Sequence, residues 1–320
     1  MFEVRRLPTV LTAQEIIDKA FRRASKVGGR NTRERIINKL STVSNILSDY
    51  FDKIIKNHPN YSELSDFYRE MIDILVGIDK LKKSLGAVNW AKNITRAIIT
   101  RGIREVKAGK KDPVEVLRAT YGRVSSVIEQ ISEELEFLKN AKSKLKEIPV
   151  FTEDPTLVVA GYPNVGKSSF VARVSSVKPE IATYPFTTKS IHIGYLNKNG
   201  LKIQVIDTPG LLDRPIHKRN IIEKKAILCL KHLADCILFI IDPTGTCGYP
   251  VEPQFSLLNE IKREFKDTPI IAAYSKSDLH NLRDLPAFSS VTGEGVENIL
   301  NEIFKNLKDK KSKSFSVKLH

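Results

Sequence analysis

The sequence predicts an all-α helical bundle followed by an α/β domain with a mostly parallel six-stranded sheet and helices on both faces. Three observations support this. A chain of 320 residues has room for about two domains. Its first half carries apolar residues at helical spacing, and its second half alternates short apolar runs with helical stretches. The proline-containing segment IPVFTEDPT separates the halves. We therefore expect domains at 1–150 and 151–310, with a lysine-rich, frayed tail at 311–320.

The clearest helix lies in the segment TRERIINKLSTVSNILSDYFDKIIKN, where apolar residues follow one helical face. We expect Thr32 or Asn31 to be its N-cap. It should end by about Asn57, because Pro59 disfavours a helical residue before it.

Further helices are expected along the rest of this half. One should begin near Ser62, another should cover about 89–108, and a long one should run from Pro113 to about Lys146. Four or five long helices with short connections indicate a bundle.

The second half contains six apolar runs that we interpret as strands. They lie at 156–160, 190–196, 201–207, 236–242, 269–275 and 287–291. Only the residues NKNG separate the second run from the third, which favours a hairpin and one antiparallel edge pair.

Charge gives the first indication of a partner. The chain has a net charge of +15, and residues 1–150 hold 29 Lys+Arg against 19 Asp+Glu. A strongly basic domain indicates a polyanionic partner, most commonly nucleic acid. Solubility, or lysine enrichment in a thermophile, would also account for the excess.

Membrane and extracellular classes find no support in the sequence. No apolar run approaches the roughly 20 residues that span a bilayer, and we see no signal peptide. The chain has three cysteines, Cys229, Cys236 and Cys247. They are too few, and their spacing too irregular, for a disulfide framework or a zinc site. We expect a reducing, cytoplasmic location and no membrane partner.

The segment GYPNVGKSS follows the first expected strand and opens a helical stretch. It has the pattern of a phosphate-binding loop, whose glycines allow a tight turn with backbone N–H groups facing phosphates. Lys167 would reach the β- and γ-phosphates, and the Ser168 hydroxyl would bind Mg²⁺. The residues expected to contact the nucleotide here are Gly161, Asn164, Val165, Gly166, Lys167, Ser168 and Ser169.

Two further segments are typical of a nucleotide switch. In DTPG, Asp207 would reach Mg²⁺ through water, and the Gly210 N–H would contact the γ-phosphate. In ATYPFTTKS, a threonine would bind Mg²⁺ and the γ-phosphate only when triphosphate is present. We choose Thr188 for this role and keep Thr187 in reserve.

The choice of base is indicated by Ser275-Lys276-Ser277-Asp278, which resembles the Asn-Lys-x-Asp motif of GTPases. Asp278 can accept from guanine N1 and N2, and Lys276 can lie over the base and brace the phosphate loop. Ser275 replaces the usual asparagine and offers fewer donors. A second base loop is expected at FSSVTGEGV, with contacts from Ser289, Ser290 and Val291. GTP and GDP are therefore the expected ligands.

Leu211 stands where many GTPases have a glutamine that orients the attacking water. Leucine cannot orient water. Either the chain does not hydrolyse nucleotide, or the chemistry is assisted from elsewhere.

Together these motifs resemble the translation-factor-like GTPases, and particularly their Obg-related branch, of which YPFTT is characteristic. LPTV near the start, AGYPNVGKSS and DPTGTCGYPVEPQ are similar to the nucleolar GTP-binding protein (Nog) family, in its short archaeal form. The resemblance covers nearly the whole chain, without the large C-terminal extension of eukaryotic members.

This resemblance implies a role in assembling the large ribosomal subunit, docked on its precursor rRNA and near ribosomal proteins. The basic segments 22–35 and 100–111 are candidate RNA contacts, with one helical face formed by Arg101, Arg104, Lys107 and Lys111. A solvated helix face is the alternative.

The resemblance also bears on Leu211, because members of this branch carry an apolar residue there. Asn164 occupies the position that ligates a monovalent cation in related enzymes, so K⁺ there would add positive charge between the β- and γ-phosphates. Alternatively, Asn164 only stabilises the loop turn. The expected reaction converts GTP to GDP and phosphate, slowly without a partner, and its candidate catalytic residues are Lys167, Thr188, Thr187, Asn164 and Gly210.

Two other classes stay open. A signalling-type GTPase with a protein partner would want a lipidation signal, and the C-terminal SVKLH has no prenylation cysteine. A nucleotide-binding scaffold with little hydrolysis would rest on Leu211 and Ser275.

Overall fold

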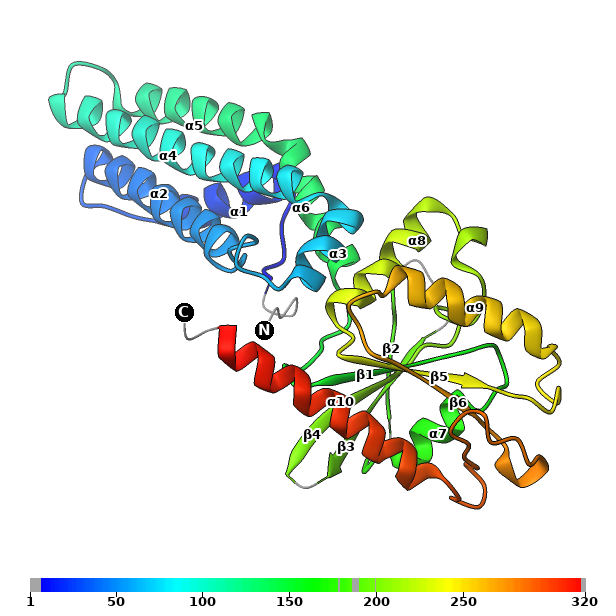
Figure 1. The fold of residues 1–320 in the computed structure, drawn as a ribbon. Coiled ribbons are helices and arrows are strands. Elements are labelled where there is room, and N and C mark those ends of the chain that lie inside the picture. The colour runs from blue at the N-terminus through cyan, green and yellow to red at the C-terminus, as the bar shows by residue number, and fades with distance from the viewer. Residues whose placement is uncertain (1–6, 178, 186–189, 199, 318–320) are drawn as a thin grey trace. The chain divides into compact units, whose positions relative to one another are not determined.

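The computed structural model describes residues 7–177, 179–185, 190–198 and 200–317, with side chains as far as Leu307 (Figure 1). The chain forms two compact units. The helical unit holds the residues up to Ser65 and Leu75–Lys146, and the sheet unit holds Asp66–Ile74 and the residues from Glu147 onward.

The helical unit is built from α1 (Ala13–Ser25), α2 (Thr32–Lys56), α4 (Ile78–Ala108), α5 (Pro113–Gln130) and α6 (Ser132–Leu145). The buried residues of α2 recur at helical spacing and are Ile36, Leu40, Val43, Leu47, Phe51 and Ile54. Asn31 caps this helix by accepting the Glu34 N–H at 2.8 Å. The expected helix ending by Asn57 is therefore confirmed.

Two expectations for the other helices are wrong. No separate helix begins near residue 89, because α4 runs unbroken from Ile78, and the break lies instead at Gly77, which has φ of 79°. The expected long helix after Pro113 is interrupted at Ile131, which separates α5 from α6.

α3 (Asp66–Val76) lies between bundle helices in the sequence but groups with the sheet unit. Phe67 packs edge-on against Phe151 at 5.2 Å between ring centroids. The Tyr68 hydroxyl accepts the Phe151 N–H at 2.8 Å. These contacts join α3 to the segment that leads into the first strand.

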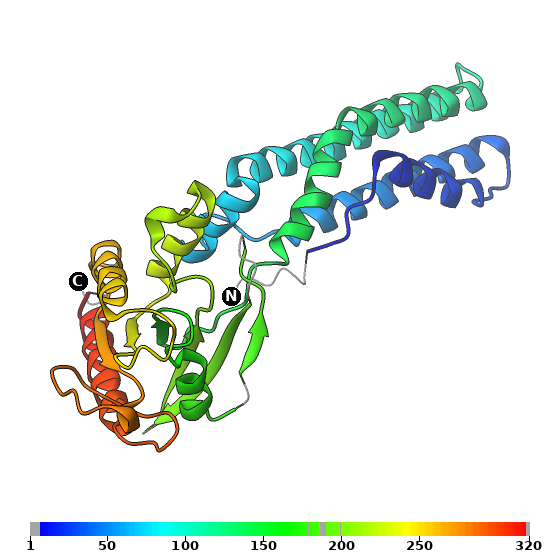
Figure 2. The ribbon, with the colours of Figure 1, turned by 90° about the vertical axis from the view of Figure 1, so that its right-hand side faces the viewer.

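The loops α1–α2 and α4–α5 lie at the same end of the helical unit (Figures 1 and 2). We call this end the tip, formed by Lys26–Asn31 and Gly109–Asp112 with the adjoining helix turns. An ideal Cβ at Gly109 would lie 2.6 Å from a guanidinium nitrogen of Arg33, so Arg33 packs directly against this glycine. The two basic segments of the sequence thus meet at one place.

The sheet has the order β2-β3-β4-β1-β5-β6. Its strands are β1 (Thr156–Ala160), β2 (Glu180–Ala182), β3 (Ile191–Lys198), β4 (Leu201–Asp207), β5 (Cys236–Ile241) and β6 (Ile270–Tyr274). β1 pairs in parallel with β4 and β5, and β5 with β6. β3 is antiparallel to both β2 and β4.

The sixth strand is β2 and not the expected 287–291. That segment makes only one bridge, between Tyr274 and Ala287. It turns because the Ser289 N–H donates to the Glu294 carbonyl oxygen, and the Ser289 hydroxyl accepts the Val291 and Thr292 N–H groups at 3.2 Å each.

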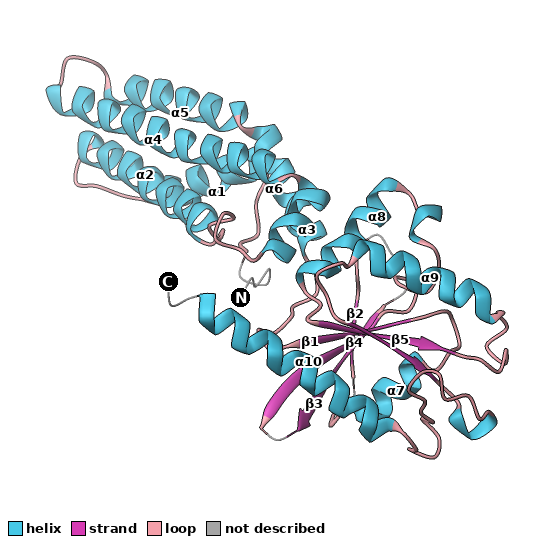
Figure 3. Cartoon of the chain, viewed as in Figure 1, coloured by secondary structure: helices cyan, strands magenta, loops and turns pink. Residues whose placement is uncertain are grey.

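Helices cover both faces of the sheet (Figure 3). α7 (Lys167–Val174) and α10 (Val296–Val317) lie on one face, and α8 (Ile221–Leu228) and α9 (Val251–Glu264) lie on the other. The backbone of α10 continues through Val317, so the expected frayed tail is helical as far as that residue. Within the described residues, no helix has both the length and the apolar character to cross a membrane.

The helical unit contains a partly buried imidazole whose titration should affect stability. His58 Nδ1 lies 2.6 Å from the Tyr61 hydroxyl, and burial lowers the pKa of His58 from 6.5 to about 4. The unfolded chain takes up this proton near pH 6.5, whereas the native state takes it up only near pH 4. The free energy of unfolding should therefore fall as pH decreases through this interval.

Substituting His58→Gln should make that decrease smaller, because glutamine takes up no proton. Urea unfolding followed by circular dichroism at pH 7 and pH 4.5 would measure it in both proteins. An equal decrease in both would show that His58 is not responsible.

Candidate nucleotide-binding site

The site lies where the carboxyl ends of parallel strands meet. In register, Val159 of β1 faces Asp207 of β4, and Ala160 faces Phe239 of β5. Loops that leave such strand ends converge at one edge of the sheet, where ligands bind in α/β folds. Three of the sequence motifs begin in these loops.

The phosphate loop after β1 requires glycine at two positions. Gly161 has φ of 137°, and a Cβ there would collide with the Ile240 carbonyl oxygen. Gly166 has φ of 102° at the start of α7. Asn164 has φ of 61° and an exposed side chain. Asparagine tolerates this left-handed conformation better than most residues.

Lys167 closes the loop on itself. Its buried ammonium donates to the carbonyl oxygens of Gly161 at 2.8 Å and Tyr162 at 2.7 Å. The first N–H groups of α7 lie at the same end of the loop, where a helix N-terminus favours anions. The loop thus concentrates an ammonium and several N–H donors around one position.

Ser168 and Asp207 form the candidate Mg²⁺ site. The Ser168 hydroxyl donates to Asp207 Oδ2 at 2.5 Å. Asp207 is fully buried, and its Oδ1 has no hydrogen-bond partner among the described residues. A buried carboxylate oxygen without a partner is costly. Hydroxyl and carboxylate oxygens are the ligands Mg²⁺ prefers, so this pair fits the ion.

His192 adds a contact that the sequence did not indicate. It pairs with Asp207 in the β3–β4 register, and its Nδ1 lies 3.3 Å from Asp207 Oδ2. The sequence feature that could have identified His192 is its position at the start of the strand that follows the YPFTT segment. Thr187 and Thr188 themselves lie outside the described residues.

The segment after β4 is held by a buried ion pair. The Gly210 N–H donates to Asp213 Oδ2 at 2.7 Å. Arg219 donates to the carbonyl oxygens of Gly210 at 2.9 Å and Leu211 at 2.6 Å, and lies 3.4 Å from Asp213 Oδ1. Leu211 is fully buried and faces no solvent. Asp213 and Arg219 were not foreseen, because their contacts depend on how this segment turns.

The first base loop follows β6. Lys276 has φ of 60°, and its ammonium donates to Asp242 and Thr246 at 2.6 Å each. The Lys276 ammonium therefore contacts the loop after β5, and not the phosphate loop that the sequence predicted. Ser275 is buried, and its Cβ lies 3.9 Å from an ideal Cβ at Gly166. Asp278 is exposed two residues beyond Lys276.

The second base loop is tied to α7. Arg173 donates to the carbonyl oxygens of Ser290 at 2.9 Å and Val291 at 3.1 Å. Ser289 is buried, whereas Val291 is 82% exposed. The fold therefore gathers the phosphate loop, Asp207 and both base loops around one end of the sheet.

Comparison with known proteins finds matches in both halves of the chain. Residues 4–152 match the NOG1 N-terminal helical domain, and residues 221–278 match nucleolar GTP-binding protein 1 (NOG1). Residues 155–248 match ferrous iron transport protein B. Among solved structures, the G domain of the T. maritima FeoB iron transporter is 29% identical, with a TM-score of 0.41, over 48% of this chain and 99% of that one.

Two relatives show the extent of the likeness. An uncharacterized protein of Methanocaldococcus jannaschii is 42% identical over 86% of this chain and 81% of its own length. Nucleolar GTP-binding protein 1 of Drosophila melanogaster is 34% identical over 74% of this chain and 37% of its own length. The chain thus spans well under half of that eukaryotic relative. With its N-terminal helical domain and its P-loop GTPase fold, the chain belongs to the nucleolar GTP-binding protein family.

Proposed function

We propose that this protein binds and hydrolyses GTP as a switch in assembly of the large ribosomal subunit, and docks on precursor rRNA through its helical unit. The observation that carries the nucleotide part is the phosphate loop closed by Lys167 beside the Ser168–Asp207 pair. The names of the eukaryotic relatives support guanine nucleotide as the ligand and ribosome assembly as the setting. We also propose a cytoplasmic location. The three cysteines are buried and free, as is usual in a reducing compartment.

The chain's own residues supply binding and orientation for phosphoryl transfer. Lys167 would exchange its two carbonyl partners for β- and γ-phosphate oxygens, and Ser168 and Asp207 would hold Mg²⁺. Bound Mg²⁺ neutralises charge that develops on the phosphates. Because Leu211 is buried, the attacking water must be oriented by Thr187, Thr188 or a ribosomal partner. We therefore expect slow turnover of the isolated protein.

The switch itself would rest on competition for one hydrogen-bond donor. The Gly210 N–H that would contact a γ-phosphate is bound here to Asp213. One N–H cannot serve both anions at full strength, so GTP must displace the Asp213 carboxylate. GDP has no γ-phosphate and leaves this contact in place. The segment would thus have two alternative arrangements, one favoured by GTP and the other by GDP.

The tip is the strongest candidate for RNA contact. Arg30, Lys107 and Lys110 are exposed there, and their side-chain cations have no carboxylate partner among the described residues. Arg101 and Lys111 belong to the expected basic face, but both pair with Glu105, at 3.1 and 3.0 Å. Cations without partners have more to gain from phosphates, and such contacts read backbone and shape more than sequence.

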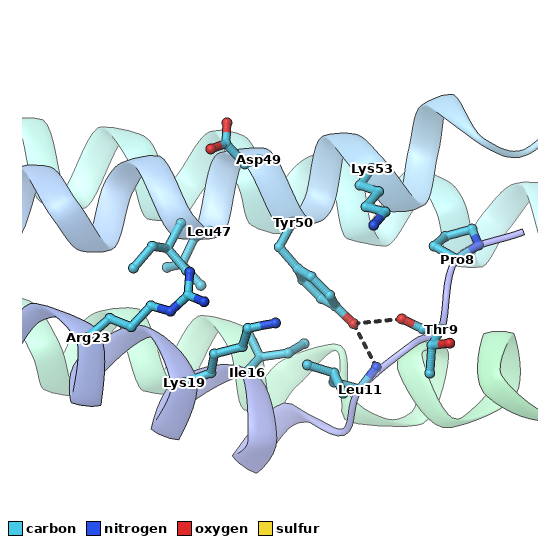
Figure 4. A pocket seen from close by; sticks show the side chains of 11 residues that line it. Pro8, Thr9, Leu11, Ile16, Lys19, Arg23, Leu47, Asp49, Tyr50 and Lys53 are labelled. Atoms are coloured by element: carbon cyan, nitrogen blue, oxygen red, sulfur yellow. Dashed lines mark hydrogen bonds between the residues drawn. The ribbon is translucent and has the colours of Figure 1, made fainter.

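A second basic surface lies in a groove of about 420 Å³ between α1, α2 and the N-terminal segment (Figure 4). Lys19, Arg23 and Lys53 line it, with Asp49 as the opposing charge. Tyr50 fixes one wall, because its hydroxyl accepts the Leu11 N–H at 2.6 Å. This groove could hold a phosphate of the same RNA.

The other reading is a signalling-type GTPase whose partner is a protein. The basic tip favours RNA over it, because cations of two separate loops lie close together there and phosphates would offset their mutual repulsion.

Asp213 offers a direct test of the switch. Asp213→Asn should raise the affinity for a non-hydrolysable GTP analogue about fivefold, because a neutral acceptor competes less well for the Gly210 N–H. GDP affinity should stay the same and serves as the internal control. Fluorescent-nucleotide titration would measure both. Equal shifts for both nucleotides would mean that Asp213 does not compete with the γ-phosphate.

Potassium dependence tests Asn164. GTP hydrolysis should be faster in KCl than in NaCl, and Asn164→Gly should remove that difference. Glycine accepts the φ of 61° but lacks the side-chain oxygen, so it separates cation binding from the loop turn. Equal hydrolysis rates in the two salts for the native protein would contradict a K⁺ site.

Charge reversal tests the tip. The triple variant Arg30→Glu, Lys107→Glu and Lys110→Glu should bind large-subunit rRNA far more weakly, with a shallower salt dependence by roughly two to three in log–log slope. Filter binding across a salt series would measure both quantities.

A matched control reverses three exposed lysines away from the tip, Lys83, Lys144 and Lys146. Along α4, Lys83 is separated from Lys107 by roughly 36 Å of helix. If the control loses as much affinity as the tip variant, the interaction is generic attraction of polyanions. If neither loses affinity, the proposed RNA surface is wrong.

A further inference from the structure

The loop after β5 carries a buried carboxylate that the nucleotide motifs do not use. Asp242 follows β5 directly and is fully buried. Its Oδ1 accepts the Thr244 N–H at 2.9 Å and the Thr244 hydroxyl at 2.5 Å. Its Oδ2 accepts the Cys247 N–H at 2.8 Å and the Lys276 ammonium at 2.6 Å. Both carboxylate oxygens are thus fully engaged.

The loop is rigid around this carboxylate. Gln254 of α9 is fully buried; its side chain accepts the Asp242 N–H at 2.9 Å and donates to the Asp242 carbonyl oxygen at 3.0 Å. Burial alone raises the pKa of Asp242, but hydrogen bonds from Lys276 and Thr244 outweigh burial and lower it to about 2. The carboxylate is therefore a fixed negative charge.

Thr246 completes the contact from the exposed side of the loop. Its hydroxyl accepts the Lys276 ammonium at 2.6 Å and donates to Asp242 Oδ2 at 3.2 Å. Lys276 is therefore held at two points, although it has a backbone conformation that side chains rarely adopt, with φ of 60°. The turn Ser277–Leu279, which contains Asp278, begins at the next residue.

Ser275 gives the first base loop a second attachment. The asparagine expected at this position has an amide with two N–H donors and one acceptor, whereas serine has one hydroxyl. That hydroxyl donates to the Ile241 carbonyl oxygen at 3.3 Å, immediately before Asp242. The first base loop is thus attached to the end of β5 by Ser275 and to the loop after β5 by Lys276.

We propose that Asp242 is a positioning residue for guanine recognition: with Thr246, it fixes Lys276 and so places the Asp278 carboxylate to read the base. This inference rests on the proposed role of Asp278 as the group that reads guanine N1 and N2. It extends that role to two residues that touch no nucleotide atom.

The test compares GDP with IDP, which lacks the 2-amino group and so one of the two contacts to Asp278. Thr246→Val removes the hydroxyl from an exposed site and should lower GDP affinity about fivefold while moving the GDP/IDP affinity ratio toward one. Thr246→Ser keeps the hydroxyl and should restore native values. The kcat at saturating GTP should stay within about twofold, because the phosphate loop is untouched.

Asp242→Asn should reduce the GDP/IDP ratio further, since it removes the charge that holds Lys276. If this buried variant fails to fold, the comparison of Thr246→Val with Thr246→Ser still tests the inference. A Thr246→Val protein with the native GDP/IDP ratio would overturn the inference. A different result would overturn the proposed recognition of guanine itself: the native protein would then bind GDP no better than ADP.

Discussion

The nucleotide site depends on the parallel pairing of β1 with β4. This register places Asp207 opposite Val159, so that the phosphate loop and the DTPG segment leave the sheet side by side. Ser168 at the start of α7 then meets the Asp207 carboxylate at 2.5 Å. A one-residue shift of β4 would point Asp207 to the other face of the sheet. The candidate Mg²⁺ site is thus a consequence of strand register.

Two acid–base pairs, each with a buried carboxylate, hold the loops beside this centre. Asp213 with Arg219 holds the segment that would sense the γ-phosphate, and Asp242 with Lys276 holds the loop that would read the base. Buried ion pairs contribute little net stability, but removing one partner is costly, so they define one geometry strongly. The two pairs differ in solvent exposure: Arg219 is buried, whereas Lys276 is partly exposed. The first pair would have to rearrange with GTP, and the second would not.

The sequence was most informative where structure is local. The helix that GYPNVGKSS opens, the N-cap at Thr32 or Asn31 and the strand LKIQVID depend on neighbouring residues. The structure has a helix from Lys167, a cap at Asn31 and a strand at Leu201–Asp207. The sequence failed where tertiary contacts decide. The short strand β2 has only three residues, two of them exposed, and forms because β3 offers a free edge. The break at Gly77 was hidden because both sides of it have helical apolar spacing.

The partners of the site residues were the least predictable part. Arg219 meets Gly210 and Leu211 only after the intervening segment has folded back, and Lys276 meets Asp242 from another strand. The sequence identified Lys276 as a base-loop residue but gave no sign that its ammonium would bind the DPTGTCGYP loop. That motif contributed to the family resemblance, and the structure gives its first residue a physical role.

The most direct test of the account is binding to large-subunit precursors by protein loaded with a non-hydrolysable GTP analogue or with GDP, across a salt series. A switch that docks through the helical unit predicts tight binding whose affinity differs between the two nucleotides at every salt concentration. Binding that ignores the nucleotide and collapses at modest salt would contradict it, because only generic attraction between a basic domain and a polyanion would then remain.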